Sequence, residues 1–297
     1  MSDEVPLVSV GIPTYNRPEG LRRTLECITG QTYQNLEIIV SDNCSPGPET
    51  ERVVREFMEK DSRIQYFKQE ENKGPTFNFR FVLEKATGEY FMWAADDDDW
   101  DPTYVEKCVN ALLERPNAAL AYSDPYFRDY QGWNLYSYEC DISSSSPSPV
   151  KRAIRLLTQD YPNTPIYGLI RTNIIKRIPL FEKYGYDQII VLILALSGPI
   201  LRIEKGLFVY GTKGISASTK KLLEHQKIDY QSRYFLQLSL LIEFIKVLIR
   251  VPVMINPIER AFLITLVIMK FILIKDKRHA IIYGIEAYIG DRLLRRS

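Results

Sequence analysis

Residues 90–100 read YFMWAADDDDW, an apolar and aromatic run followed directly by four aspartates and a tryptophan. The apolar run, residues 90–95, predicts a buried strand, and the carboxylates of Asp96–Asp99 then leave its end together. Like charges held this close repel one another, so we expect a cation among them. Carboxylate oxygens with open positions for a ligand suit Mg²⁺ or Mn²⁺, whose usual partner is a substrate diphosphate.

Two other interpretations of the four aspartates remain open. The run could form a solvated acidic turn, or it could begin a helix, where negative charge is favourable. A calcium loop fits less well. Asp97, Asp99 and Asp101 are spaced as at the start of an EF-hand, but Pro102 stands where the turn glycine belongs, and no glutamate closes the loop.

The composition describes an ordinary globular protein, with 297 residues, 45% of them hydrophobic and 25% charged. A net charge of +1 gives no reason to expect a nucleic acid as partner. The N-terminus leads into an apolar strand without a signal-peptide pattern, so we expect a cytoplasmic protein. Two histidines do not support a histidine-based hydrolase. The cysteines lack metal-site spacing and indicate reduced thiols: Cys27, Cys44, Cys108 and Cys140.

The first part of the chain alternates strand and helix patterns. Helices with apolar residues three and four apart lie between apolar strands expected at residues 7–12, 36–40, 64–67, 90–95 and 118–122. Such units imply right-handed crossovers and a parallel sheet, whose ligands bind beyond the carboxyl ends of the strands. Polar clusters lie at three of those ends: Thr14–Arg17, Asp42 with Asn43, and Asp96–Asp99.

Two later segments have a different character. The serine-rich run 143–149 indicates either a flexible lid or a plain linker. A short strand is expected at residues 166–172, and a run without charge follows at residues 188–201. That run is too short to span a bilayer, which needs about 20 residues.

The C-terminal stretch predicts two helices with wide apolar faces, at residues 235–250 and 258–274. In the first helix the polar residues recur at spacings of four, three and four and form one narrow stripe: Ser239, Glu243, Lys246 and Arg250. Apolar faces this wide must be covered by protein or by lipid. A helical hairpin packed on itself or in a homodimer, and peripheral attachment to a membrane, remain equal alternatives.

Five ordered motifs resemble glycosyltransferase family 2, whose members have the GT-A fold and use nucleotide-sugar donors. The motifs are VSVGIPTYNR at residues 8–17, LEIIVSDN at 36–43, NKG at 72–74, GEY at 88–90 and the aspartate run. YGLIRT at 167–172 and Asp187 also match family patterns. The resemblance implies an α/β, Rossmann-like GT-A domain at residues 1–220, with a mostly parallel sheet flanked by helices. Residues 221–297 then form a helical C-terminal extension.

The resemblance also implies the nucleotide site. Asp42 matches the acid that receives the base or ribose, which suits a carboxylate at a strand end. Taken alone, Asp42 is better interpreted as a turn former or helix cap. The residues expected at the nucleotide are Pro13, Thr14, Tyr15, Arg17, Asp42, Asn72, Asp96 and Asp97.

The metal-binding DXD motif of the family maps onto Asp96, Asp97 and Asp98. The resemblance implies that Asp98, together with Asp96, holds Mg²⁺ or Mn²⁺. A fourth aspartate departs from the common spelling of the motif, so its register stays open by one residue. Asp99 could instead cap a helix.

Asp187 matches the position at which the family places its catalytic base. A carboxylate before an apolar helix would be partly desolvated, which raises its basicity. An N-cap for the helix starting at Gln188 is the alternative. If Asp187 is not the base, Glu182 is the next candidate.

Other residues near these motifs have weaker assignments. Trp100 could stack on a sugar ring, although core packing is the commoner use of an aromatic side chain. Trp93, Tyr126, Trp133 and Tyr138 are similar cases. Arg171 and Lys213 could balance phosphate charge, but structural or surface roles are more common for both.

The sequence therefore predicts an inverting, metal-dependent glycosyltransferase acting on a saccharide or lipid-linked acceptor. Inversion follows from the resemblance and from one base carboxylate without an evident enzyme nucleophile. A dehydrogenase is disfavoured because no G-x-G-x-x-G follows the first strand. A sugar nucleotidyltransferase would need a glycine-rich loop there. A catalytically inactive scaffold of the same fold is the third alternative, and the intact aspartate run argues against it.

Overall fold

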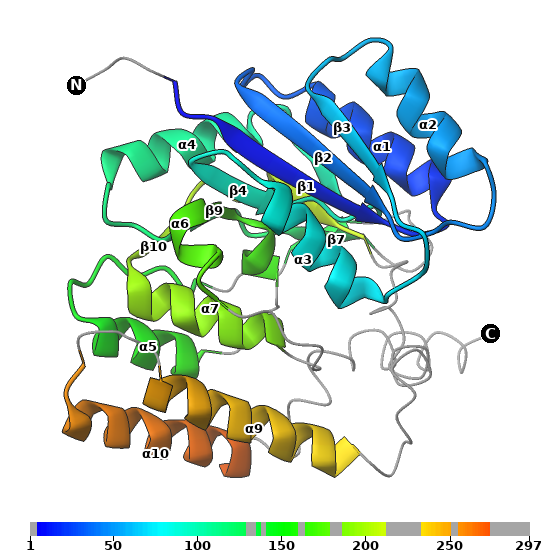
Figure 1. Cartoon of the computed structure of the whole chain (residues 1–297). Helices are drawn as coiled ribbons and strands as arrows, with labels where there is room; N and C mark the ends of the chain where they lie inside the picture. The colour runs from blue at the N-terminus through cyan, green and yellow to red at the C-terminus, as the bar shows by residue number, and fades with distance from the viewer. Residues whose placement is uncertain are drawn as a thin grey trace, which may run out of the picture.

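The computed structural model describes residues 5–128, 135–137, 141–159, 164–178, 186–211, 233–250 and 255–273. Within them, a seven-stranded sheet lies between layers of helices (Figure 1), which confirms the expected α/β class. The strands are β1 (Val8–Thr14), β2 (Leu36–Asp42), β3 (Ile64–Lys68), β4 (Tyr90–Trp93), β5 (Asp99–Trp100), β6 (Leu120–Tyr122), β7 (Tyr126–Arg128), β8 (Leu135–Ser137), β9 (Leu169–Arg171), β10 (Ile200–Arg202) and β11 (Phe208–Tyr210). The helices are α1 (Pro18–Thr29), α2 (Glu49–Met58), α3 (Pro75–Lys85), α4 (Tyr104–Glu114), α5 (Pro149–Thr158), the 3₁₀ helix η1 (Thr164–Tyr167), α6 (Thr172–Ile175), α7 (Tyr186–Ser197), α9 (Arg233–Arg250) and α10 (Pro257–Leu273).

The large sheet has the strand order β10-β6-β9-β4-β1-β2-β3. All neighbouring strands are parallel except β9, which runs antiparallel to both β4 and β6. The strand expected at residues 166–172 is therefore partly wrong. Gly168 N–H donates to the Pro165 carbonyl (3.1 Å) and closes a 3₁₀ turn, so β9 begins only at Leu169. A second sheet, in the order β5-β11-β7-β8, was not predicted.

The two faces of the large sheet support separate parts of the core. Val8, Val10 and Ile12 alternate along β1 toward a cluster that includes residues of α1, α2 and α4. Phe91 and Trp93 of β4 belong to the other cluster, which includes residues of α3, α5 and α7. Figure 1 shows α7, α5 and then the α9–α10 pair stacked below the sheet. The parallel strands are buried on both faces, as their continuous apolar runs predicted.

The C-terminal helices pack on each other and on the α/β domain. Phe244 and Leu248 of α9, with Leu263 and Val267 of α10, join the core cluster that contains Phe91. One face of the helical hairpin is therefore covered by protein, and the division at residue 220 stays a prediction. The expected polar stripe is only partly exposed, because Glu243 is buried and pairs with Lys246 (3.0 Å). None of the described helices combines the length and hydropathy of a membrane span.

The serine-rich segment is fastened to the domain by one buried arginine. Arg152 donates to the carbonyls of Ser146 (2.7 Å) and Pro147 (3.0 Å), and also to those of Ala195 (2.6 Å) and Leu196 (3.0 Å) at the end of α7. These bonds satisfy carbonyls that a helix end leaves open. The segment is thus held against α7, and whether it acts as a lid or as a plain linker stays a prediction.

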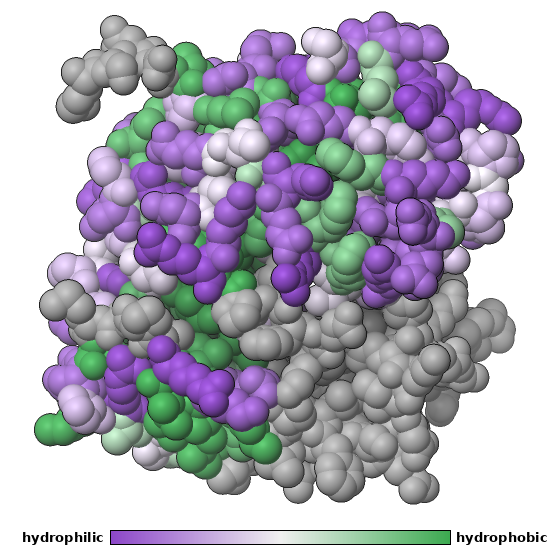
Figure 2. Space-filling model, in the orientation of Figure 1, coloured by the Kyte–Doolittle hydropathy of each residue, from purple (hydrophilic) through white to green (hydrophobic). Residues whose placement is uncertain are grey.

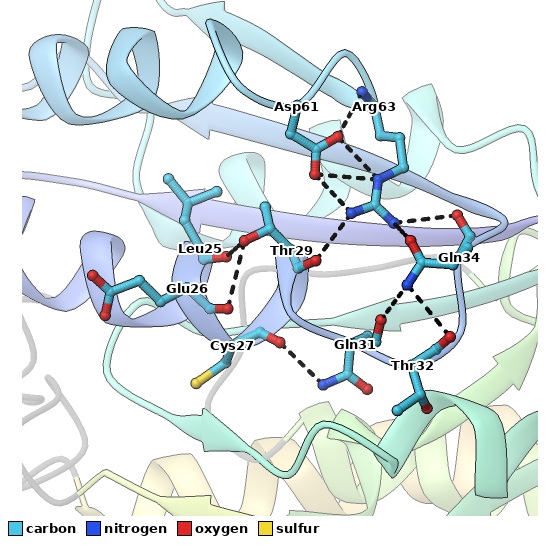
Figure 3. Close-up of polar contacts among 9 residues, drawn as sticks. All are labelled: Leu25, Glu26, Cys27, Thr29, Gln31, Thr32, Gln34, Asp61 and Arg63. Atoms are coloured by element: carbon cyan, nitrogen blue, oxygen red, sulfur yellow. Dashed lines mark hydrogen bonds and ion pairs between the residues drawn. The ribbon is translucent and has the colours of Figure 1, made fainter.

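Arg63 joins three segments at the N-terminal end of the sheet (Figure 3). Its guanidinium bonds both carboxylate oxygens of Asp61, with distances of 2.9 Å from Nε and 2.7 Å from Nη2. It also donates to the carbonyls of Thr29 at the end of α1 (3.1 Å) and Gln34 before β2 (3.2 Å). A bidentate pair with this geometry fixes where α1, β2 and β3 meet.

A second carboxylate at that end, the side chain of Glu37, is buried and has all its hydrogen-bond donors within the protein. It is 8% exposed, and it accepts hydrogen bonds from Ser9 Oγ, from the hydroxyl and N–H of Thr87, and from the N–H of Gly88 (3.0 Å). Four donors compensate the lost hydration of one carboxylate. The N-terminal end of the sheet is therefore held by completed polar networks.

Candidate functional site

The four aspartates follow β4 at the opposite, C-terminal end of the sheet. Helix α1 packs tightly against them, since Thr24 Oγ1 donates to the carbonyl of Ala95 (3.0 Å). A Cβ at Gly20 would lie 2.0 Å from the carbonyl oxygen of Asp96, so only glycine permits this approach. Asp96 is 6% exposed and Asp98 is 1% exposed, so the solvated-turn interpretation is wrong. The helix-start interpretation is wrong as well, because the run leads into the short strand β5.

Arg17 provides the cation expected among the carboxylates. Its Nη1 lies 3.0 Å from Asp96 Oδ1 and 3.3 Å from Asp97 Oδ2. The other oxygen of Asp96 accepts a bond from Thr14 Oγ1 (2.8 Å). Asp99 is ion-paired more loosely with Arg23, at 3.8 Å. Two residues predicted at the nucleotide, Thr14 and Arg17, thus hold Asp96 in place.

Asp98 is the most enclosed of the four carboxylates. Its Oδ1 accepts a hydrogen bond from the backbone N–H of Gly211 (2.7 Å). Its Oδ2 is buried and has no hydrogen-bond partner among the described residues. A buried carboxylate oxygen without a donor calls for a proton or a cation, and such oxygens are preferred ligands of Mg²⁺. This oxygen therefore fits the predicted metal, and the role of Asp98 as a ligand stays a prediction.

Asp96 fits the metal less well than Asp98, because Thr14 and Arg17 already occupy its two oxygens. Across the described residues, no group of three or more His, Cys, Asp or Glu side chains is arranged to hold a metal ion. Mg²⁺ is commonly held by one or two carboxylates, with substrate phosphates and water completing its shell. A site built on Asp98 would follow that rule.

The pKa shifts describe the electrostatics of the cluster. Burial raises the pKa of Asp96, although Arg17 and Thr14 lower it in part. Burial and the charge of Asp96 raise the pKa of Asp97 to about 6. Burial and the charge of Asp97 raise the pKa of Asp98 well above its usual value. Arg17 alone therefore does not balance the buried negative charge, and a second cation would stabilise the cluster.

The other side chains predicted at the nucleotide differ in exposure. Pro13 is buried inside β1, whereas Tyr15 is 42% exposed directly after the strand. Asn72 is exposed, and its Oδ1 accepts bonds from Asn43 Nδ2 (2.9 Å) and from the N–H of Gly74 (2.9 Å). Asn72 thus shapes its own loop, and its contact with a nucleotide stays a prediction.

Asp42 is fully buried at the end of β2. Its Oδ1 accepts from the N–H (2.8 Å) and the hydroxyl (2.6 Å) of Ser45, and its Oδ2 accepts from the Tyr66 hydroxyl (3.0 Å). Ser45 Oγ in turn accepts the N–H of Asn16 (2.8 Å), whose φ is 53°. Asp42 therefore closes a turn, as one interpretation expected, and through Ser45 it holds the loop after β1. Direct contact of Asp42 with a nucleotide stays a prediction.

Asp187 lies in the first turn of α7. Its Oδ1 accepts the N–H of the next residue, Gln188 (3.0 Å). Because α7 already begins at Tyr186, Asp187 lies inside the first turn and not at the expected N-cap position. The preceding residues 179–185, which include Glu182, lie outside the described residues. The base role of Asp187 stays a prediction.

The pKa of Tyr167 is affected by carboxylates from two parts of the predicted site. Burial raises the pKa of its phenol well above the usual value, and Tyr210 and the carboxylates of Asp98, Asp97 and Asp187 raise it further. The three carboxylates therefore all act on this one ring. That Asp187 and Asp98 belong to one site stays a prediction.

Sequence reasoning missed three residues of this region: Ser45, Tyr167 and Gly211. Tyr167 opens the YGLIRT motif, so a signal for it was available. Gly211 follows β11, and a Cβ there would lie 1.9 Å from the carbonyl oxygen of Asp97. Nothing in the local sequence indicates which distant carboxylate Gly211 contacts.

Several weaker assignments are resolved. Trp100 is 4% exposed and stacks on Phe208 with ring centroids 5.4 Å apart, so it packs in the core. Arg171 donates to the carbonyls of Ala118 (2.8 Å) and Leu112 (3.1 Å), a structural role. Asp99 belongs to β5 and does not cap a helix. Lys213, Trp133 and Tyr138 lie outside the described residues.

A Rossmann-like, mostly parallel sheet with an acidic cluster after β4 defines the GT-A class of glycosyltransferase folds. Solved structures of similar fold include TarS of S. aureus in complex with UDP-GlcNAc, with a TM-score of 0.66 and 16% identity over 93% of this chain and 78% of that one. A mannosyltransferase of Pyrobaculum calidifontis, in complex with GDP-Man and Mn²⁺, has a TM-score of 0.57 and 16% identity over 99% of this chain and 87% of that one. At this identity the likeness shows the fold alone.

The model of "Glycosyl transferase family 2" matches residues 9–194, and the chain belongs to that family. A GalNAc(5)-diNAcBac-PP-undecaprenol beta-1,3-glucosyltransferase of Campylobacter jejuni is 34% identical over 40% of this chain and 37% of its own length. A putative teichuronic acid biosynthesis glycosyltransferase of Bacillus subtilis is 31% identical over 39% of this chain and 45% of its own length. An uncharacterized glycosyltransferase of Rickettsia typhi is 30% identical over 61% of this chain and 56% of its own length. The chain thus spans about half or less of the relatives it matches.

Proposed function

We propose that this protein is an inverting, metal-dependent glycosyltransferase. It moves a sugar from a nucleotide-sugar donor to an acceptor hydroxyl in the synthesis of surface polysaccharide or glycolipid. The acceptor is a saccharide or a lipid-linked saccharide, as the names of the Campylobacter and Bacillus relatives suggest. The reaction takes place in the cytoplasm, where the C-terminal helices either contact the membrane peripherally or form a homodimer.

The observation that carries this proposal is the buried aspartate run with its unpartnered Asp98 oxygen. Bound there, Mg²⁺ or Mn²⁺ would neutralise the diphosphate as it leaves. Thr14 and Arg17 fix Asp96 beside that position. Such a cation would stabilise the leaving group, which carries the charge of the broken bond.

Asp187 supplies the other half of the reaction. Its carboxylate takes the proton of the acceptor hydroxyl while the acceptor oxygen attacks the anomeric carbon. The bond from that carbon to the diphosphate breaks on the opposite side, so the configuration inverts. The charges of Asp98 and Asp187 both raise the pKa of Tyr167, which supports placing the two carboxylates in one site.

A thermal-shift screen with UDP, GDP and dTDP, each with and without Mn²⁺, tests the proposal. One nucleotide should raise the melting temperature only when Mn²⁺ is present. A ligand at about 100 times its Kd adds about 2.7 kcal/mol to the free energy of unfolding. A protein that none of these nucleotides stabilises would contradict the proposal, and a stabilised protein unable to hydrolyse its donor would be the inactive scaffold.

A further inference from the structure

Helix α10 carries apolar side chains on two opposite sides. Leu263 and Val267 are fully buried in the core. On the other side, exposed apolar side chains recur at helical spacing: Ile258 is 82% exposed, Phe262 52% and Met269 48%. Ala261 and Thr265 are also exposed and complete this face, which contains no charged residue. We call Ile258, Ala261, Phe262, Thr265 and Met269 the α10 face.

The two charged residues near the start of α10 form hydrogen bonds within the helical hairpin. Glu259 Oε2 accepts the N–H of Asn256 (2.9 Å) and so closes the turn before the helix. Arg260 donates to the carbonyls of Leu248 (2.6 Å) and Ile249 (3.2 Å) at the end of α9. Neither charge lies on the α10 face. A helix that is apolar on both sides is stable only when both sides are covered.

Helix α9 extends this surface and adds positive charge. Ile242 is 42% exposed and Ile249 is 59% exposed, and the exposed Lys246 and Arg250 lie on the same side at spacings of three and four. Figure 2 shows hydrophobic residues at the bottom of the molecule, where α10 lies in Figure 1, with hydrophilic residues next to them. The surface thus combines apolar side chains with cations.

The sequence concentrates its positive charge on the same part of the chain. Residues 233–297 contain 11 Lys and Arg against 5 Asp and Glu, a net charge of +6. Because the whole chain has a net charge of +1, residues 1–232 carry −5. Charge asymmetry of this size is typical of proteins that contact an anionic surface at one end. It also disfavours a second copy as the cover, since two such segments would repel each other.

We propose that the α10 face, with Ile242, Lys246, Ile249 and Arg250 of α9, docks on an anionic lipid bilayer. The hairpin lies in the interface plane, with its apolar side chains between the headgroups and its cations at the phosphates. This goes beyond glycosyl transfer, because the surface would bind lipid without any sugar substrate.

Vesicle flotation of the full-length protein tests the docking surface. Vesicles of phosphatidylcholine and phosphatidylglycerol in equal amounts should carry the protein upward, and vesicles of phosphatidylcholine alone should not. The variant with Ile258→Ser and Phe262→Ser should bind the anionic vesicles about tenfold more weakly, because it loses buried apolar area. The variant with Lys246→Gln and Arg250→Gln should lose about tenfold at low salt and little at high salt.

Leu113→Ser is the matched control, because Leu113 is 51% exposed on α4, outside the docking surface. It should float as the wild type does, and circular dichroism should show that every variant is folded. The proposal is overturned if wild-type protein stays at the bottom, or if the folded Ile258→Ser and Phe262→Ser variant floats unchanged. It is also overturned if light scattering shows a dimer that this variant converts to a monomer, since a second copy would then cover the face. No sugar donor is present, so the outcome does not depend on the transferase activity.

Discussion

The two ends of the large sheet differ in how many partners their carboxylates have. At the N-terminal end, Glu37 accepts bonds from four donors and Asp61 is paired with Arg63 through both oxygens. At the C-terminal end, one guanidinium serves Asp96 and Asp97, and Asp98 keeps an oxygen without a partner among the described residues. The carboxylates at the first end have their partners within the protein, whereas the second end leaves an oxygen that the proposed metal would bind.

This difference has an energetic meaning. A buried carboxylate costs free energy unless hydrogen bonds or a cation compensate it. Because the networks at the N-terminal end are completed, changing a residue there should lower stability and leave activity unaffected. The crowded carboxylates at the C-terminal end lower the stability of the protein without ligand, so changing them should alter activity more than folding. The predictions below test this comparison.

The largest effect is expected for Asp98→Asn. The amide removes the charge that would hold Mg²⁺ or Mn²⁺, so turnover should fall by about 10³-fold or more. The melting temperature without ligand should stay level or rise, because the pKa of Asp98 is raised and a neutral side chain relieves repulsion. Mn²⁺-dependent stabilisation by the nucleotide should disappear in calorimetry. Near-normal turnover at saturating Mn²⁺ would remove the metal role from Asp98.

Asp187→Asn should lower turnover by about 10²-fold or more while donor affinity persists. Asparagine keeps the side-chain oxygen that accepts the Gln188 N–H but cannot take a proton. Rate and melting temperature should be measured on one preparation. A residue that only stabilises the first turn of α7 would show the reverse, with reduced stability and turnover per folded molecule nearly intact. In that case the search for the base moves to Glu182.

Much of this arrangement could be predicted because local patterns control it. The helix expected between the strands at 90–95 and 118–122 is Tyr104–Glu114, and the one expected at 258–274 is Pro257–Leu273. Both are long and periodic, so their apolar spacing defines them. The position of the aspartates at a strand end followed from the apolar run before them.

The rest depends on contacts between distant residues. Strands β7 and β11 have three residues each, too few to show an alternation, so the second sheet had no signal. The bond from Gly211 to Asp98 joins residues 113 positions apart. The ion pairs of Arg17 with the aspartates also depend on how loops meet at the edge of the sheet. The same is true of the hydrogen bonds from Ser45 to Asp42, and no single motif encodes either contact.

Glu37→Gln tests the stable end of the sheet. Glutamine replaces one acceptor oxygen by an NH2 group, which would point at N–H and O–H donors and leave them without an acceptor. The free energy of unfolding should therefore fall by about 2 kcal/mol. Urea denaturation measures the loss. Turnover per folded molecule should not change, because Glu37 lies at the end of the sheet away from the aspartates. A large loss of turnover in the folded variant would break the comparison.

Asp42→Asn and Ser45→Ala separate two roles of Asp42. If Asp42 acts by holding the loop after β1 through Ser45, both changes should weaken donor binding by about tenfold, without altering the choice among nucleotides. If Asp42 contacts the base, only Asp42→Asn should change that choice. Calorimetric titration with UDP, GDP and dTDP distinguishes the two results. Tyr66→Phe removes the hydroxyl that donates to Asp42 Oδ2 and so measures what that bond contributes to donor binding.

The smallest effect is expected for Asp61→Asn, and it should depend on pH. Hydrogen bonds from Arg63 hold the pKa of Asp61 below its usual value. The pair therefore stabilises the folded state at a pH above the unfolded pKa of about 3.9, and this stability is lost as the pH falls through the lower pKa of the folded state. Wild-type protein should exceed the variant by about 1 kcal/mol in free energy of unfolding near neutral pH. The gap should close in acid, where both side chains are uncharged. A gap that is constant with pH would mean that the charge of Asp61 contributes nothing, and that shape alone holds α1, β2 and β3 together at this end of the sheet.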